Sequence, residues 1–444
     1  MKQLPLMSRG LDEIIGRHRG QTITAACFIH QAQSLALSLG GYDRVINLCH
    51  DRHLFSLSFA ASILAGCTTL LPANRLTETV DRLMQTHPGS LIISDRDIDG
   101  LAYPCLDPTA SLAMQGRATR IPLVDENLLA AVVFTSGSTG PSTSIPKYWK
   151  TLHASSRINA VEYGPSGPLT WAVATVPPQH MWGLETSVLL PWFGPVAMTE
   201  GQPFFAADII TAIEQLPAPR ALISTPVHLR NLAESGLAMV PIDLVYSATA
   251  PLSSALAERM EATTGGRVIE VFGCSEAGCL ARRDAARDEP WTLFQDFTLE
   301  RVAEQFQVRA HHLPGPVALL DLLHVAPDGR FRLIGRHSDL VNIAGKRASL
   351  ADLAEALLSI DGVIDGVIFQ PADNEHGPVS RLAALVVAPD MSAHEVRQAL
   401  ARQIDPAFMP RPLRLVPALP RAESGKLPRQ SLDHFFRQVC EPTG

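Results

Sequence analysis

The chain has 444 residues, of which 46% are hydrophobic and 18% are charged, and its formal net charge is −7. This length allows about three domain-sized units, or one large body with a smaller appendage. The negative charge and the scattered basic residues give no reason to expect a nucleic acid or an anionic membrane as a partner. No run reaches the ~18 apolar residues that cross a bilayer, and the first residues lack the apolar core of a secretory signal. We therefore expect a cytoplasmic protein.

Short β-rich runs alternate with helical patterns up to about residue 330. The first part is predicted to form strands and helices in alternation: strand 43–49, helix 54–66, strand 68–73, helix 77–87, and strands 90–95 and 129–137. Further strands are predicted at 169–176, 220–225, 243–248 and 266–273, separated by helical stretches. This alternation indicates an α/β fold, with a large N-terminal body of mostly parallel sheets covered by helices.

The last ~100 residues have an α+β pattern of their own, which is a common size for a domain. Helices are predicted at 349–360 and 392–404, and strands at 362–370 and 381–389. The second helix opens with Ser392 followed three residues later by Glu395, the pattern of a capping box. We place a domain boundary near Ser338, which divides the chain into a body of residues 1–337 and a smaller C-terminal domain of residues 338–444.

The stretch VFTSGSTGPSTSIPKYW, residues 133–149, follows a predicted strand and is rich in glycine and hydroxyl side chains. Such loops offer backbone N–H groups to phosphate oxygens, although this stretch taken alone could be a flexible turn. A Walker loop needs Gly-Lys-Ser/Thr, whereas Gly140 is followed by Pro141, so a P-loop NTPase is not expected. A second loop, GCSEAG at 273–278, also follows a strand. Ligands of parallel sheets bind beyond the carboxyl ends of strands, so the two loops can converge on one crevice.

Four further segments accompany this loop: VPPQHMWGLE, VFGCSEAG, LLDLLHVAPDGRFRLIGRHSDLVNIAGKR and LPRAESGKLPR. Together with FTSGSTG, and in this order, they resemble the adenylate-forming superfamily of acyl-CoA synthetases, luciferases and peptide-synthetase adenylation domains. The resemblance runs from about YDRVINLC to SGKLPRQSL. It implies a large body and a small C-terminal lid joined at a hinge. It also implies that a carboxylate attacks the α-phosphate of ATP and releases pyrophosphate, after which a thiol attacks the acyl-adenylate.

The resemblance assigns the β- and γ-phosphates of ATP to one loop: Thr135, Ser136, Gly137, Ser138, Thr139 and Gly140. Pro146 and Lys147 supply the end of the family pattern after four extra residues, Ser142 to Ile145, and the role survives if this insert bulges outward. Glu276 would hold Mg²⁺, with Thr139 as a second ligand. Further expected ATP contacts are Thr249, Ala250, Gly273, Phe272 (adenine), Ser275 (phosphate), Asp321 (ribose hydroxyls) and Arg336 (ribose or phosphate). The usual Thr-Gly before the ribose acid is Leu319-Leu320 here.

Lys426 is expected to reach the carboxylate and the α-phosphate, and to stabilise the transition state electrostatically. His180 falls on the family's gate position at the start of a helix beside the acid pocket, where it would shield the carboxylate and then move for the thiol. The segment Asn342 to Arg347 matches the one that swings in for the second step, and Ser338 occupies the hinge position. A lid with two positions can assemble one site for two reactions.

Amino-acid-activating relatives have an aspartate directly after the gate, where this chain has Met181, so the substrate is expected to lack an α-amine. The residues expected to line the acid pocket are His180, Trp182, Gly183, Ser247, Ala248, Thr249 and Val271. Ala248-Thr249 replaces a Gly-Gly pair and narrows the slot, which favours a compact aryl acid.

The chain also resembles the ligases of bacterial aryl-polyene and xanthomonadin-type pigment clusters, which load a hydroxybenzoate onto an acyl carrier protein. A CoA ligase for an aryl or short to medium aliphatic acid is an alternative. An inactive relative that binds acyl-adenylate without turnover is an alternative of another class.

Overall fold

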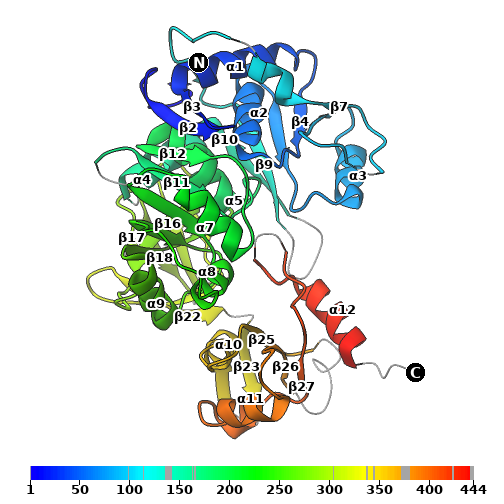
Figure 1. Ribbon diagram of the computed structural model, residues 1–444, viewed down its shortest axis with the longest axis vertical. Helices are drawn as coiled ribbons and strands as arrows, with labels where there is room; N and C mark the ends of the chain where they lie inside the picture. The colour runs from blue at the N-terminus through cyan, green and yellow to red at the C-terminus, as the bar shows by residue number, and fades with distance from the viewer. Residues whose placement is uncertain are drawn as a thin grey trace.

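The computed structural model describes residues 2–98, 100–113, 115–135, 143–162, 164, 167–303, 305–336, 339–343, 346–371, 381–422 and 425–440. The side chains of Thr135, Arg336 and Arg347 lie outside this description. In Figure 1 the N-terminal part of the chain forms a large body, and the chain from β23 onward forms a smaller unit below it. Within the described ranges, no helix has the length and apolar character that would span a membrane.

A six-stranded sheet at the top of the body has the strand order β10-β9-β5-β4-β6-β7, and only the β9–β10 pair is antiparallel. Its strands are β4 (Arg44–Asn47), β5 (Thr68–Leu71), β6 (Leu91–Ile93), β7 (Cys105–Leu106), β9 (Leu129–Thr135) and β10 (Thr143–Tyr148). The neighbouring helices are α1 (Ala25–Leu37), α2 (Arg52–Ala65), α3 (Thr77–Thr86) and the short η1 (Pro108–Ala113). Helix α2 begins after the capping side chain of Asp51, which accepts from Leu54 N, and it ends at Gly66 in the left-handed region.

A nine-stranded sheet forms the rest of the body's centre, with the order β17-β16-β15-β14-β13-β11-β12-β2-β3. Its strands are β2 (Ile14–His18), β3 (Gln21–Thr24), β11 (Thr170–Ala174), β12 (Val196–Thr199), β13 (Arg220–Ser224), β14 (Leu244–Ser247), β15 (Arg267–Cys274), β16 (Gly278–Asp284) and β17 (Thr292–Leu293). The helices of this part are α4 (Trp149–Glu162), α5 (Met181–Gly183), η2 (Leu184–Leu189), α6 (Leu190–Phe193), α7 (Ala206–Glu214), α8 (Pro226–Glu234) and α9 (Ser254–Thr264).

The central strands of this sheet are buried on both faces, which explains why they read as continuous apolar runs. Leu222 and Val245 pack with α7, α8 and α9 on one face. Ile223 and Tyr246, which point the other way, join a second cluster that contains Trp182. The side chains of one strand therefore serve two separate hydrophobic cores.

Small sheets complete the body. They comprise β1 (Gln3–Pro5) with β8 (Leu123–Asp125), then β18 (Thr298–Val302), β19 (Gln305–Arg309) and β20 (Val317–Ala318), and the hairpin of β21 (Asp321–Val325) and β22 (Phe331–Arg336). Asp321 and Arg336 face each other in this hairpin, so the predicted hairpin around the PDG turn is confirmed.

The C-terminal unit has its own core, in which Leu357, Ile368 and Val386 are buried. Its strands are β23 (Leu340–Ile343), β24 (Lys346–Ser349), β25 (Asp365–Phe369), β26 (Ala383–Val387) and β27 (Leu413–Leu415), and its helices are α10 (Leu350–Leu358), α11 (Ala393–Leu400), η5 (Pro406–Phe408) and α12 (Arg429–Cys440). The capping box at Ser392 and Glu395 is confirmed. The predicted α/β body with a small α+β C-terminal unit is confirmed as well, whereas residue 338 lies outside the described ranges and the boundary placed there stays a prediction.

The insert after Pro141 does not bulge outward at the three of its residues that the structure describes. Thr143, Ser144 and Ile145 instead begin β10 and pair with Thr135, Phe134 and Val133 of β9. The pairing satisfies those backbone polar groups that face β9, and it buries the Ile145 side chain, which an outward bulge would leave in water. The extra residues therefore lengthen a hairpin.

Candidate active site

Four neighbouring strands, β11, β13, β14 and β15, run parallel and end at one edge of the large sheet. The segments that follow them carry many of the predicted site residues, including His180, Ala248 and Glu276. In the smaller sheet β5 and β9 are also parallel neighbours, so the loop after β5 leaves the same edge as the predicted phosphate loop. Topology alone thus gathers distant motifs, as expected for parallel sheets.

Phe272, the residue expected to hold the base of ATP, lies near the end of β15. Phe272 packs against Trp291, with ring centroids 5.5 Å apart, and against Phe331 at 6.0 Å. This packing fixes the partly exposed Phe272 ring as a firm apolar surface. At Gly273 a Cβ would lie 2.3 Å from the carbonyl oxygen of Gly278, so only glycine allows the hairpin to close.

The loop after β14 carries Thr249 in a left-handed conformation, with φ of 80°. This region favours glycine and is strained for a β-branched residue. A charged pair that the sequence reasoning missed, buried Glu270 and partly buried Arg283, holds the loop. Glu270 Oε1 accepts from Leu252 N at 2.9 Å, and Arg283 Nη2 donates to Leu252 O at 3.0 Å. Burial raises the pKa of Glu270 to about 7 against the opposing effect of Arg283. The only hint of Glu270's role in the sequence is that it is a single acid within an otherwise apolar strand pattern.

The residues expected to line the acid pocket lie at the start of α5 and at the ends of β14 and β15. Trp182, Ala248 and Val271 are buried in one hydrophobic cluster. Ser247 is fully buried, and its hydroxyl has no hydrogen-bond partner among the described residues. Gly183 is required by the backbone, because a Cβ there would lie 1.9 Å from Pro177 O. Trp182, Ala248 and Val271 therefore lie together, whereas Ser247 follows Tyr246 on β14 and lies on the opposite face of the sheet, beside Glu270.

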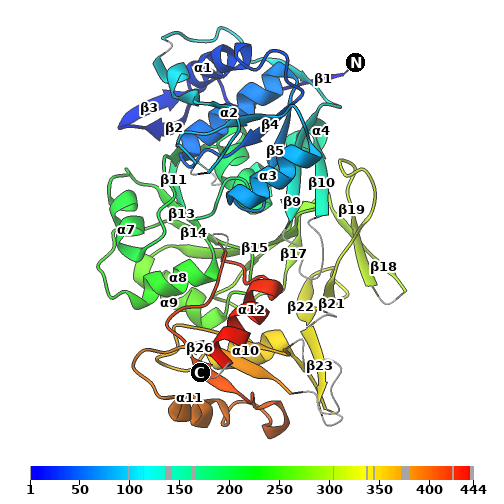
Figure 2. The same cartoon turned by 90° about the vertical axis from the view of Figure 1, so that its right-hand side faces the viewer.

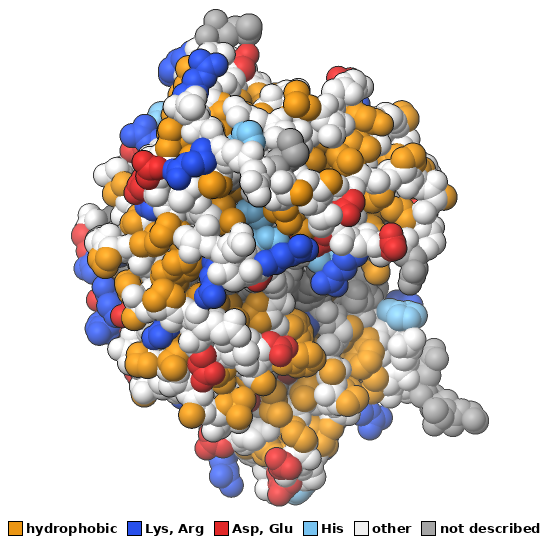
Figure 3. All heavy atoms as spheres, turned by 45° about the horizontal axis from the view of Figure 1, so that its top comes forward, with side chains coloured by type: hydrophobic (Ala, Val, Ile, Leu, Met, Phe, Trp, Pro, Cys, Tyr) orange, Lys and Arg blue, Asp and Glu red, His pale blue; other side chains and the backbone are white. Residues whose placement is uncertain are grey.

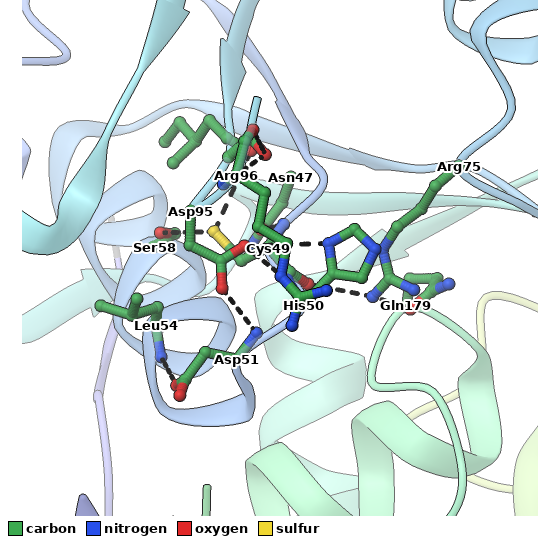
Figure 4. Close-up of polar contacts among 12 residues, drawn as sticks. Asn47, Cys49, His50, Asp51, Leu54, Ser58, Arg75, Asp95, Arg96 and Gln179 are labelled. Carbon is green, nitrogen blue, oxygen red and sulfur yellow. Dashed lines mark hydrogen bonds and ion pairs between the residues drawn. The ribbon is translucent and has the colours of Figure 1, made fainter. Parts of the chain in front are cut away.

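His180, the predicted gate, is partly buried and precedes α5. Burial, and then the positive charges of Lys426 and Arg75, lower its pKa to about 4, so the imidazole is neutral at pH 7. Sequence reasoning missed Arg75, which follows β5. Arg75 Nη2 donates to Gln179 Oε1 at 2.8 Å and to Cys49 O at 2.9 Å, and Figure 4 shows the two side chains meeting. Two cations from distant parts of the chain thus act on the gate.

Lys426 stands on a tight turn of the C-terminal unit, and its side chain is exposed. Ala422 N donates to Lys426 O at 2.8 Å, and Gly425 N donates to Ala422 O at 2.8 Å. At Gly425 a Cβ would lie 3.2 Å from Thr225 Oγ1, so this turn rests on the body at the end of β13. Arg230 Nη1 donates to Leu358 O at 2.9 Å, which is a second contact between the body and the C-terminal unit. The two parts lie against each other in both views (Figures 1 and 2).

Several predicted residues fall where the structure gives no placement. Ser136, Gly137, Ser138, Thr139 and Gly140 lie outside the described residues, as do Ser338 and the middle of the segment 342–347. For Thr135 and Arg336 only the backbone is described. Their roles stay predictions. On the surface in Figure 3, Lys, Arg and His side chains gather near the middle of one face, which would suit an anionic ligand.

Among the described residues, His18, Asp51 and Glu200 form the one grouping of histidine and acid side chains that metal spacing would allow. Asp51 caps α2, and Glu200 accepts from the backbone N–H of Arg19, so both acids already have structural roles. Glu276, the expected magnesium ligand, is separate from this group and has an exposed side chain. Its backbone carbonyl accepts a hydrogen bond of 2.8 Å from Lys147 Nζ.

A family model for the AMP-binding enzymes matches residues 20–296. The chain belongs to this family of AMP-binding enzymes, in agreement with the resemblance seen in its motifs. The match ends before the C-terminal unit that carries Lys426.

The chain is 23% identical over 495 residues to the anthranilate–CoA ligase of Pseudomonas aeruginosa, an alignment that covers 96% of this chain and 94% of that protein. It is 20% identical over 313 residues to a 3,4-dihydroxybenzoate–[aryl-carrier protein] ligase of Bacillus anthracis, covering 68% and 72%. The match to the acetyl-coenzyme A synthetase of Mycobacterium tuberculosis is 33% identical over 143 residues, and it spans 31% of this chain but only 20% of that protein. Among solved structures, ATP-bound MatB of Rhodopseudomonas palustris shares the fold, with a TM-score of 0.80, 18% identity and 98% coverage of both chains.

Proposed function

We propose that this chain is an ATP-dependent acid–thiol ligase. It converts a carboxylic acid to its acyl-adenylate with release of pyrophosphate, and it then passes the acyl group to a thiol with release of AMP. The observation that carries the proposal is the seating of the Lys426 turn against the end of β13, where the lysine charge acts on His180. A cation at this point would offset the negative charge of a carboxylate and a phosphate that approach each other. The His180 imidazole is neutral at pH 7, so it would not compete with Lys426 for the negative charge of these groups.

The side chains at the end of β15 fit ATP and magnesium by their chemistry. The partly exposed Phe272 ring offers a face for adenine, and the exposed Glu276 carboxylate is the oxygen ligand that Mg²⁺ prefers. Mg²⁺ would neutralise phosphate charge when bound. Asp321, at the start of the β21–β22 hairpin, would hold the ribose hydroxyls.

A compact aryl acid such as a hydroxybenzoate is the substrate class that the pocket supports. Trp182, Ala248 and Val271 would provide apolar walls for such an acid. Relatives named for anthranilate and for 3,4-dihydroxybenzoate support this class. Their acceptors differ, coenzyme A in one and an aryl-carrier protein in the other, and we propose an acyl carrier protein for this chain.

Pyrophosphate release from ATP and Mg²⁺ across a panel of aryl and aliphatic acids tests the adenylation step. We expect release with hydroxybenzoates and a loss of at least 100-fold in the Lys426→Ala variant. Lys150→Ala, at an exposed lysine on α4, is the matched control and should match the parent. Absence of release with every acid would favour the inactive relative, and full activity of Lys426→Ala would refute the assigned role.

The acceptor is tested by offering coenzyme A and a phosphopantetheinylated carrier protein side by side. We expect acyl transfer to the carrier protein, detected as a mass increase of the holo-protein. Efficient turnover with free coenzyme A alone would contradict the carrier-protein proposal and support an aryl–CoA ligase.

A further inference from the structure

The turn between β15 and β16, which carries Glu276, is held from the protein interior by two buried side chains of opposite charge. Lys147 on β10 is 2% exposed, and its Nζ donates to Glu276 O at 2.8 Å. Glu185 on η2 is 1% exposed, and its Oε2 accepts from Cys279 N at 2.9 Å. A cation therefore binds one end of the turn, and an anion binds the other end.

The turn also fits closely onto Glu185. Gly278 has φ of 80°, and a Cβ there would lie 2.5 Å from Glu185 Oε1. Any other residue at this position would be strained and would push the carboxylate away from Cys279 N. The backbone around Glu276 is thus fixed, while the Glu276 side chain itself is exposed.

The two side chains carry opposite charges and are both almost fully buried. Burial lowers the pKa of Lys147, and the negative charge of Glu185 is the strongest effect that opposes it. Burial raises the pKa of Glu185, and the contacts with Cys279 and the charge of Lys147 oppose that rise. Because an unpaired buried charge is costly, loss of either side chain should disturb the other.

Three motifs meet at this pair. Lys147 belongs to the hairpin that follows the predicted phosphate loop, Glu185 follows the gate helix, and Glu276 is the expected magnesium ligand. The ammonium that the family pattern would place near phosphate is bonded to the Glu276 carbonyl, and the side chain is almost fully buried. The position of Lys147 points to a link between the hairpin and the metal-binding turn.

We propose that Lys147 and Glu185 are positioning residues that hold the Glu276 carboxylate where magnesium–ATP needs it. Lys147 then acts through the backbone of Glu276 and not as a ligand of the triphosphate. This inference rests on the proposed function, because it assumes that Glu276 binds the magnesium of ATP. Partners that orient a metal ligand commonly change metal affinity by about 10- to 100-fold when they are removed.

The test compares Lys147→Met, Glu185→Gln and Glu185→Leu with the parent. Pyrophosphate release is measured against Mg²⁺ concentration, and Mn²⁺ binding in the presence of ATP is followed by electron paramagnetic resonance. We expect Lys147→Met and Glu185→Leu to raise the half-saturating metal concentration about tenfold in both measurements. Glu185→Gln keeps an acceptor for Cys279 N and should raise the half-saturating metal concentration less. Lys150→Met, at an exposed lysine three positions from Lys147, is the control and should leave it unchanged.

Two outcomes would overturn the proposal. One is an unchanged metal dependence in a folded Lys147→Met variant. The other is a higher KM for ATP at saturating Mg²⁺ with the metal constant unchanged, which would make Lys147 a phosphate ligand. If a single variant fails to fold, the double variant Lys147→Met/Glu185→Leu removes both charges together and should fold. A parent that releases no pyrophosphate refutes the proposed function instead, and the Mn²⁺ measurement still tests the positioning role.

Discussion

Arg421 and Asp365 form a two-pronged ion pair, in which Arg421 Nε and Nη2 each lie 2.7 Å from a carboxylate oxygen of Asp365. The same guanidinium donates through Nη1 to Gly425 O at 2.9 Å. Arg421 therefore fastens the turn that carries Lys426 to strand β25. Paired hydrogen bonds of this kind fix orientation as well as distance.

On the proposed function, loss of this ion pair should slow adenylation while Lys426 itself is kept. We expect Arg421→Gln and Asp365→Asn to lower kcat for pyrophosphate release about tenfold, because a displaced Lys426 would meet the reacting groups less often. The KM for ATP should change little. Steady-state kinetics on both variants check this, with the exposed Arg397→Gln on α11 as control. If both variants release pyrophosphate as fast as the parent, the Arg421–Asp365 ion pair is not needed to position Lys426.

The pKa of His180 should depend on charges from two distant segments. Arg75→Gln removes one of the cations that lower this pKa to about 4, so we expect it to rise while staying below 6.5, since burial is the larger cause. An NMR titration of the imidazole measures the change. Arg82→Gln, at an exposed arginine on α3, should leave the pKa where it is. An unshifted His180 in the Arg75 variant would contradict the assignment.

Acid should destabilise this protein through its buried histidines, with Glu270, whose pKa burial raises to about 7, acting in the opposite direction. Burial is the main cause that lowers the pKa of His53 to about 3 and the pKa values of His153, His180, His228 and His312 to about 4. Between pH 6.5 and 4 the unfolded chain therefore binds more protons than the folded one, and stability falls as pH falls, by up to ~1.4 kcal/mol per pH unit for each histidine. Urea unfolding at pH 7.5, 6 and 5 measures the slope. A stability that stays constant over this range would disprove the expectation.

Thr249→Gly should stabilise the protein and widen the slot. The φ of 80° at Thr249 is strained for threonine and relaxed for glycine, so we expect a gain of about 1 kcal/mol after the added freedom of the unfolded chain is subtracted. Thermal unfolding measures the gain in stability. Pyrophosphate release with bulkier acids tests whether the acid pocket has become wider. Thr211→Gly on the exposed face of α7 should instead lower stability, as glycine does in helices. A destabilised Thr249→Gly would argue against strain at this position.

Local patterns predicted most of the framework. The alternation of strands and helices, the Asp321–Arg336 hairpin and the capping box at Ser392 follow from short-range rules, and the structure contains them. The motifs also led to the AMP-binding family. The outward bulge was wrong at Thr143–Ile145, because strand pairing depends on a partner that a local pattern does not reveal.

The residues that sequence reasoning missed were missed for the same reason. Glu185, Glu270 and Arg75 act through contacts with segments far away in the sequence, and Lys147 meets Glu276 across 129 positions. Charged residues of this type look like ordinary surface residues in the sequence until the fold supplies their partners. Sequence reasoning could therefore name the motifs of the AMP-binding family but not the side chains that hold them in place.

The pairing of Thr135 with Thr143 has a consequence for protein engineering. The segment between them leaves and re-enters the sheet at neighbouring points, and the free energy of closing a loop grows only slowly with its length. Residues can be added or removed there with the anchoring strands unchanged. Strand pairing thus fixes the two ends of this segment, so variants that differ in its length can test the predicted phosphate role without displacing β9 or β10.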